Sequence, residues 1–132
     1  MTSRIASCSC GQLKVTTHGE PVRISVCHCL ACQRRTGSVF GAQARFPRDA
    51  VEISGESREY VRIGDEGNAV THHFCPTCGA TVHYSVAGYD VGRIAIPVGA
   101  FADPVFPAPT VSVYEERMHS WVGLPEGIEH LA

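Results

Sequence analysis

Seven cysteines in this chain have spacings that suit metal ligation better than disulfide bonding. They fall into three groups, Cys8 and Cys10, then Cys27, Cys29 and Cys32, then Cys75 and Cys78. Thiolates on tight turns can meet one metal ion, and zinc accepts four of them in a tetrahedron without redox chemistry. A lone C-x-x-C pair would be weak evidence, because redox proteins share it. Several groups together predict zinc ligands.

Seven thiolates cannot fill two sites of four, so one predicted site has three cysteines or takes a ligand of another type. Two partitions fit the spacing. In the first, Cys8 and Cys10 join Cys75 and Cys78, which leaves Cys27, Cys29 and Cys32 together. In the second, Cys29 and Cys32 join Cys75 and Cys78, which leaves Cys8, Cys10 and Cys27. We favour the first, because three ligands within six residues can wrap one ion, although spacing leaves both open.

A zinc ion with three protein ligands and an open fourth position is the usual arrangement of a catalytic site, whereas a closed four-ligand site is structural. The open position could take water or a substrate thiol, and zinc would hold that thiol as a nucleophilic thiolate. Two alternatives stay open at this point. The fourth ligand is a nearby histidine or carboxylate and both sites are structural, or the three cysteines serve redox chemistry or zinc storage.

Composition predicts one globular domain over residues 1–132, with 44% hydrophobic and 18% charged residues. The formal net charge of -2 gives no reason to expect nucleic acid or an anionic membrane as a partner. No apolar run approaches the roughly 20 residues of a spanning helix, and the first residues lack a signal-peptide pattern. We therefore expect a cytoplasmic protein, in which thiols stay reduced and available to metals.

Short β-branched and aromatic runs, cut by glycine, proline or aspartate, predict a mainly β fold around these cysteines. Leu30–Thr36 is predicted to form one short helical turn that Gly37 ends. The expected strands are Gln12–Thr17, Val22–Val26, Val39–Phe46, Val51–Ser54, Glu59–Arg62, Ala69–Phe74, Thr81–Ser85, Arg93–Val98 and Thr110–Tyr114.

Other polar residues near the cysteines are weaker candidates. His28 lies between two ligands, and in an extended chain its side chain points away from their metal. His83 and His119 are candidate acid–base groups, since histidine titrates near neutral pH. Arg34 and Arg35 either offset the charge of the three-cysteine site or grip a substrate carboxylate. Five aromatic residues are expected in the core or a pocket wall: Phe40, Phe46, Phe74, Tyr84 and Trp121.

Five segments together resemble the glutathione-dependent formaldehyde-activating enzyme family, also called the centromere protein V/Gfa domain. They are Cys8–Gly11, Cys27–Gly37, Phe74–Gly79, Val98–Pro104 and the tail Tyr114–Trp121. The resemblance runs from about Cys8 to Leu131 in a compact chain without the longer extensions of the members named for that activity. No motif for glutathione contact is matched.

The resemblance implies a β-tent fold of small antiparallel sheets pinned by two Zn2+ ions. It assigns Cys8, Cys10, Cys75 and Cys78 to a structural zinc, and Cys27, Cys29 and Cys32 to a second, catalytic zinc that is fully or partly occupied. The implied activity is a carbon–sulfur lyase reaction, the condensation of glutathione with formaldehyde to S-hydroxymethylglutathione. The implied partner is a small thiol such as glutathione. The alternative is a non-catalytic zinc-binding module for a protein or small-thiol ligand.

Overall fold

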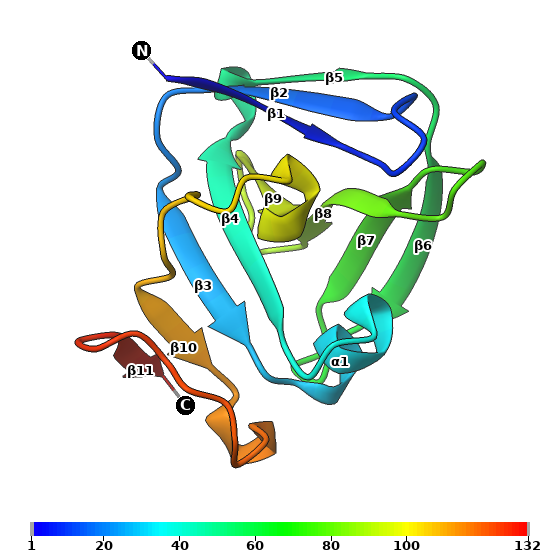
Figure 1. Ribbon diagram of the computed structural model, residues 1–132. Coiled ribbons are helices and arrows are strands. Elements are labelled where there is room, and N and C mark those ends of the chain that lie inside the picture. The colour runs from blue at the N-terminus through cyan, green and yellow to red at the C-terminus, as the bar shows by residue number, and fades with distance from the viewer. Residues whose placement is uncertain (1, 132) are drawn as a thin grey trace.

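Two sheets build the fold, and a computed structural model describes them over residues 2–131 (Figure 1). The smaller sheet has three strands in the order β1 (Ser3–Ser7), β2 (Lys14–His18) and β5 (Val51–Ser54). The larger has eight strands in the order β11 (Glu129–Leu131), β10 (Val111–Val113), β3 (Arg23–Cys27), β4 (Gly41–Pro47), β9 (Arg93–Pro97), β8 (Thr81–Val86), β7 (Ala69–Phe74) and β6 (Arg58–Ile63). The only α-helix of the described part is α1 (Leu30–Thr36).

The predicted mainly β fold is confirmed, and β5, β7 and α1 have the bounds expected from the sequence. The strands β1 and β11 were not predicted, because Ser3–Ser7 and Glu129–Leu131 are largely polar and only their pairing makes them strands. The larger sheet is antiparallel except at one edge, where β10 pairs in parallel with both β3 and β11.

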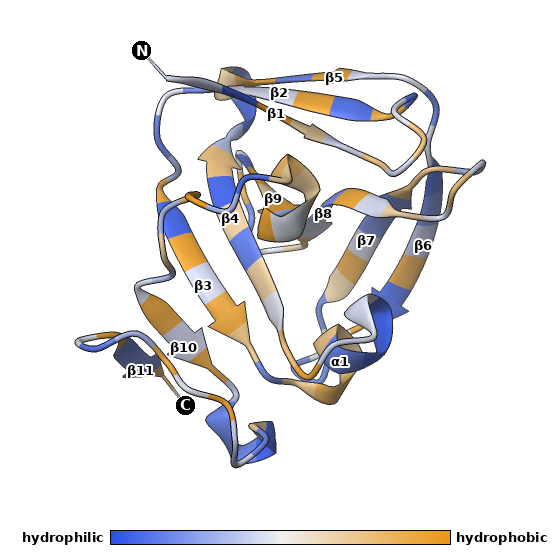
Figure 2. Ribbon diagram, in the orientation of Figure 1, coloured by the Kyte–Doolittle hydropathy of each residue, from blue (hydrophilic) through white to orange (hydrophobic). Residues whose placement is uncertain are grey.

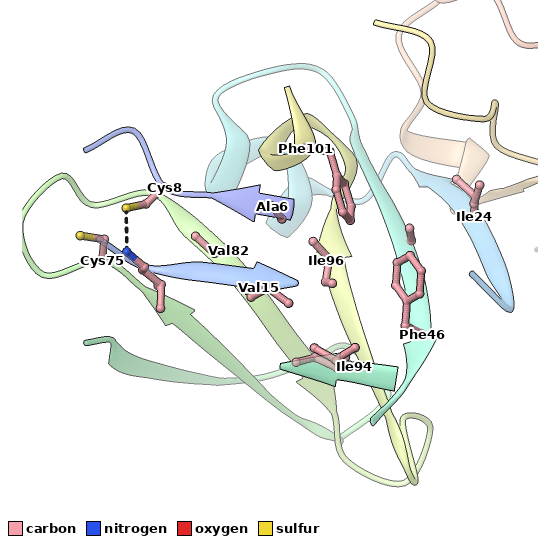
Figure 3. Packing of buried hydrophobic residues seen from close by; sticks show 13 residues of the cluster. Ala6, Cys8, Val15, Ile24, Phe46, Cys75, Val82, Ile94, Ile96 and Phe101 are labelled. Carbon is pink, nitrogen blue, oxygen red and sulfur yellow. Dashed lines mark hydrogen bonds between the residues drawn. The ribbon is translucent and has the colours of Figure 1, made fainter. Parts of the chain in front are cut away.

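The hydrophobic core lies between the two sheets. Strand β3 alternates, so Ile24 and Val26 face this core while Ser25 and Cys27 face the opposite side of the larger sheet. Figure 2 shows how hydrophobic and hydrophilic residues are distributed along the strands of both sheets. The 3-10 helix η2 (Val98–Phe101) closes the space between the sheets. Figure 3 shows the cluster and the cysteines at its edge; its buried members include Ala6, Cys8, Val15, Ile24, Phe46, Cys75, Val82, Ile94, Ile96 and Phe101.

The opposite face of the larger sheet is more polar and is held by a buried ion pair. The Arg45 side chain on β4 donates from Nε to Asp90 Oδ1 over 2.7 Å, and Asp90 Oδ2 accepts from the Val86 amide over 2.8 Å. The ion pair connects β4 to the turn between β8 and β9, and thereby shapes the face on which Cys27 lies.

One aromatic prediction is wrong. Phe46 is fully buried and Tyr84 is buried, but the Trp121 residue keeps 71% of its surface exposed. The chain after the 3-10 helix η3 (Glu115–Arg117) runs over the surface, and the Trp121 ring meets the edge of His119 at a centroid distance of 6.1 Å. The prediction rested on the apolar residue type of Trp121. That type alone could not show that the segment around Trp121 has no sheet to pack against.

No helix among the described residues has the length and hydrophobicity needed to cross a membrane.

Replacing Gly55 with alanine is expected to destabilise the protein by about 3 kcal/mol or more. An added Cβ would lie 1.9 Å from the Gln12 carbonyl oxygen, and the Gly55 φ of +96° already disfavours any side chain. Urea unfolding of the zinc-loaded protein measures the loss. Gly67→Ala is the control, because its φ is +88° and nothing lies within 4 Å of its added Cβ. Equal losses in the two variants would show that the clash is relieved without cost.

Candidate metal centres

Four thiols from distant parts of the chain meet beside the hydrophobic core. Cys8 and Cys10 follow β1, Cys75 and Cys78 follow β7, and all four sulfurs lie within 4.8 Å of one another. Cys10 Sγ is 3.6 Å from both Cys8 Sγ and Cys75 Sγ. A disulfide would need about 2.05 Å. Tetrahedral zinc with bonds of about 2.3 Å places its sulfurs about 3.8 Å apart, so the group fits that ion.

Two similar turns present these thiols. In the first turn the Cys8 amide donates to the Leu13 carbonyl, and in the second the Cys75 amide donates to the Ala80 carbonyl. Each turn passes through a glycine with positive φ, Gly11 at 87° and Gly79 at 83°. Glycine reaches this conformation at no steric cost, which explains why each cysteine pair is followed by one.

Backbone and side-chain donors stabilise the charge of these sulfurs. Although desolvation raises it, hydrogen bonds from the Cys78 amide, the Gln12 side chain and the Thr77 amide lower the pKa of Cys75 to about 5. Gln12 Nε2 donates to Cys75 Sγ over 3.0 Å and also to the Glu56 carbonyl over 2.7 Å. We did not predict Gln12 from the sequence, where only its position beside Gly11 pointed to it.

The remaining three thiols gather where β3 runs into α1. Cys27 ends β3, Cys29 is the N-cap of α1, and Cys32 lies in its first turn, with all three sulfurs within 4.8 Å of one another. Cys29 Sγ accepts from the Cys32 amide over 3.3 Å. As predicted, Gly37 ends the helix, in a left-handed conformation with its amide donating to the Gln33 carbonyl. Among residues 2–131, no fourth His, Cys, Asp or Glu ligand atom joins this group.

The three thiols share their charge unevenly. Hydrogen bonds from Cys27 and then Cys32 lower the pKa of Cys29 to about 2, whereas hydrogen bonds with Cys29 and then Cys32 raise the pKa of Cys27. Cys29 is thus the first of the three to ionise, and it is half-buried, whereas Cys27 is buried. The group can offer a thiolate to a metal ion near neutral pH.

A small chamber of about 130 Å³ opens beside Cys29. Tyr114 and Glu66 line it, and the Tyr114 hydroxyl donates to Glu66 Oε1 over 3.1 Å. Tyr114 has a positive φ of 57°, a strained backbone of the kind that gathers at functional sites. Burial and then the contact with Glu66 raise the pKa of Tyr114 to about 12, so its hydroxyl stays protonated and can donate.

Two larger cavities adjoin this chamber. One, of about 430 Å³, shares Glu66 and Tyr114 with it, and the other, of about 490 Å³, shares Arg62. Several buried polar atoms in their walls have no partner in the described part of the chain: Arg23 Nε, Gln43 Oε1, Arg35 Nη2 and His72 Nδ1. Unpaired buried polar atoms are costly, so this face is suited to a polar ligand that pairs with them.

The histidines proposed from the sequence lie elsewhere. His28 is fully buried, points away from the three thiols and hydrogen-bonds Ser112 Oγ through Nε2 over 3.0 Å. His83 stacks on His73 at 4.3 Å and lines none of the three cavities. His119 is exposed and contacts Gln33. The structure thus brings neither acid–base candidate to Cys29.

The fold and the cysteine groups define a small mainly β protein with two thiol clusters able to hold metal ions. Residues 3–117 match the model of the glutathione-dependent formaldehyde-activating enzyme family, and the chain belongs to that family. Its fold is similar to a structural-genomics crystal structure of a Rhodobacter sphaeroides protein, with a TM-score of 0.58 and 19% sequence identity. The similarity covers 78% of this chain and 91% of the other.

Proposed function

We propose that the protein is a zinc-dependent carbon–sulfur lyase-type enzyme that acts on a thiol adduct, such as S-hydroxymethylglutathione formed from glutathione and formaldehyde. The observation that carries the proposal is the group of Cys27, Cys29 and Cys32, which has no fourth protein ligand among the described residues and borders a chamber through Cys29. Three protein ligands and an open position suit catalysis rather than structure. Membership of the family supports this activity and a glutathione-related thiol as the substrate.

In this proposal the two thiol groups have different tasks. Cys8, Cys10, Cys75 and Cys78 would hold a structural zinc that joins β1 to β7, and Cys27, Cys29 and Cys32 would hold the second ion. When bound there, zinc supplies the charge that keeps a substrate thiol ionised and nucleophilic near neutral pH. Residues 1–132 would act as one zinc-binding domain.

Tyr114 is the residue of this chain best placed to assist the carbonyl partner. Its protonated hydroxyl lines the chamber beside Cys29. As the sulfur–carbon bond forms, the aldehyde oxygen gains negative charge, and a donor already in position stabilises that charge. We propose that the Tyr114 hydroxyl turns its single proton from Glu66, to which it donates in the structure, to this oxygen, and that solvent supplies the proton that completes the hydroxyl group.

Exchange spectroscopy tests the proposal directly. The zinc-loaded protein is added to glutathione and 13C-formaldehyde, and NMR measures how fast the adduct and its components interconvert. We expect at least about 100-fold acceleration over the uncatalysed exchange, the lower end of the effect of general acid–base groups alone. Metal-stripped protein and a sample without protein serve as controls.

A second measurement separates the enzyme from a binding module. Glutathione added to the cobalt-substituted protein is expected to change the sulfur-to-cobalt absorption bands. A spectral change without faster exchange would favour a non-catalytic thiol-binding module, and no response in either experiment would refute a thiol site altogether.

A further inference from the structure

The cavity of about 490 Å³ beside the three thiols has a strongly basic wall. Arg34 and Arg35 reach it from the last turn of α1, and Arg62 reaches it from β6. Its lining contains no aspartate or glutamate among the described residues, and none of these arginines has a carboxylate partner in that part of the chain. Three cations with no carboxylate among the lining residues make this wall positive, and the anions on which Arg62 and Arg35 act are the thiolates of Cys29 and Cys32.

Packing holds Arg35 in place without neutralising it. Its Cζ lies 5.2 Å from the centroid of the buried Tyr84 ring, while its Nη2 is buried and has no hydrogen-bond partner in the described chain. Stacking on an aromatic ring fixes the plane of a guanidinium but leaves its donors free. This nitrogen is covered by the chain on the side of Gly41 and Cys32, so an acceptor in the cavity would meet the other nitrogens of the guanidinium, which has no carboxylate partner among the described residues.

Arg62 connects this cavity to the thiol site. It is half-buried on β6, and it lines both the large cavity and the small chamber that contains Cys29. His72 lines the same cavity and is affected by the arginine charges. Burial and then the charges of Arg35 and Arg62 lower the pKa of His72 to about 4. With His72 neutral, the guanidinium groups are the charges that an entering ligand meets.

We propose that Arg62 and Arg35 form a carboxylate-binding subsite, so that the three-thiol centre selects thiols that carry a carboxylate. The inference rests on the proposed function and names how its substrate is recognised. A thiol seated beside Cys29 would extend past Arg62 into the basic cavity. There the planar guanidinium groups match a carboxylate through paired charge-assisted hydrogen bonds, shielded from solvent on one side by Tyr84.

Calorimetry of the zinc-loaded protein tests this subsite. Wild type is expected to bind glutathione about tenfold or more tightly than its diethyl ester, as expected for a lost charge-assisted hydrogen bond. Arg62→Gln is expected to abolish the difference by weakening glutathione binding alone, and Arg62→Lys to restore part of it. Arg58→Gln is the matched control, since Arg58 is exposed on the same strand and lines none of the three cavities.

The outcomes separate the subsite from the function on which it rests. If wild type binds glutathione while Arg62→Gln and Arg35→Gln keep its preference over the ester, the subsite is refuted and the thiol site stands. If wild type binds neither glutathione nor its diethyl ester, the proposed function is refuted, and the subsite that rests on it is refuted as well. If phosphopantetheine, a thiol with a phosphate, binds more tightly than glutathione and depends on Arg62, the anion is a phosphate and the carboxylate assignment is wrong.

Discussion

Replacing Cys75 with serine is expected to leave the protein unfolded at physiological temperature and to remove one zinc equivalent per chain. Cys75 is fully buried, and its sulfur accepts from Gln12 and from the amides of Thr77 and Cys78. Structural zinc contributes about 10–16 kcal/mol in small zinc domains, as much as the whole stability of about 5–15 kcal/mol of a typical protein. Losing this ligand therefore removes more free energy than the remaining core supplies.

Thermal unfolding followed by circular dichroism, together with metal analysis, measures both effects. Ser9→Ala is the control, because Ser9 is exposed in the same turn as Cys8 and Cys10 and offers no sulfur. We expect that variant to keep its metal and its stability. A Cys75→Ser protein that melts like wild type with both metals bound would rule out a structural role for the four-thiol group.

Replacing Cys29 with serine is expected to lower the rate of adduct exchange at least about tenfold, because losing a direct metal ligand costs no less than losing a residue that only orients such a ligand. The fold is expected to survive. Cys29 is half-buried at the N-cap of α1, and serine is a favourable N-cap that can accept the hydrogen bond from Cys32. The expected cost in stability is about 1 kcal/mol or less, apart from the lost contribution of the second metal.

Three measurements on the same sample decide this prediction: exchange by NMR, zinc per chain, and the melting temperature. We expect zinc to fall from two equivalents to one while the circular dichroism spectrum stays that of wild type. The contrast with Cys75→Ser is the test of the division of tasks. Equal collapse of the two variants would contradict it, and full activity in Cys29→Ser would exclude the three-thiol group from the chemistry.

Much of the fold could be predicted because local physics decided it. Alternation on β3 sends Ile24 and Val26 to the core and Cys27 to the other face, and a period of two is visible in any sequence. Gly37 ends α1 because only glycine takes a left-handed turn without strain. The sequence of an edge strand such as β1 shows no such local pattern. Its residues become a strand because they pair with β2, and not because of their own types.

Most of the residues around the thiols could not be predicted. Arg62 lies in an exposed strand whose side chains show no clean alternation, and Tyr114 follows the short β10. Tyr114 reaches the chamber at Cys29 because β10 pairs with β3, and Arg62 reaches it because the ends of β3 and β6, which are five places apart in the larger sheet, converge near α1 (Figure 1). The spacing of residues along the sequence does not show which distant strands come together, so neither Arg62 nor Tyr114 could be assigned to the site from the sequence.

The cysteines show where the two kinds of information divide. Residue type and spacing by themselves determined that thiols would gather on tight turns and that one group would be short of a ligand. The grouping stayed open on spacing, because every pair is compatible with several partners. Only the tertiary structure brings Cys8 and Cys10 to Cys75 and Cys78, leaving the other three beside a cavity. The physical reason is that metal ligation needs proximity in space, which the packing of β1 and β2 over the larger sheet supplies (Figure 1).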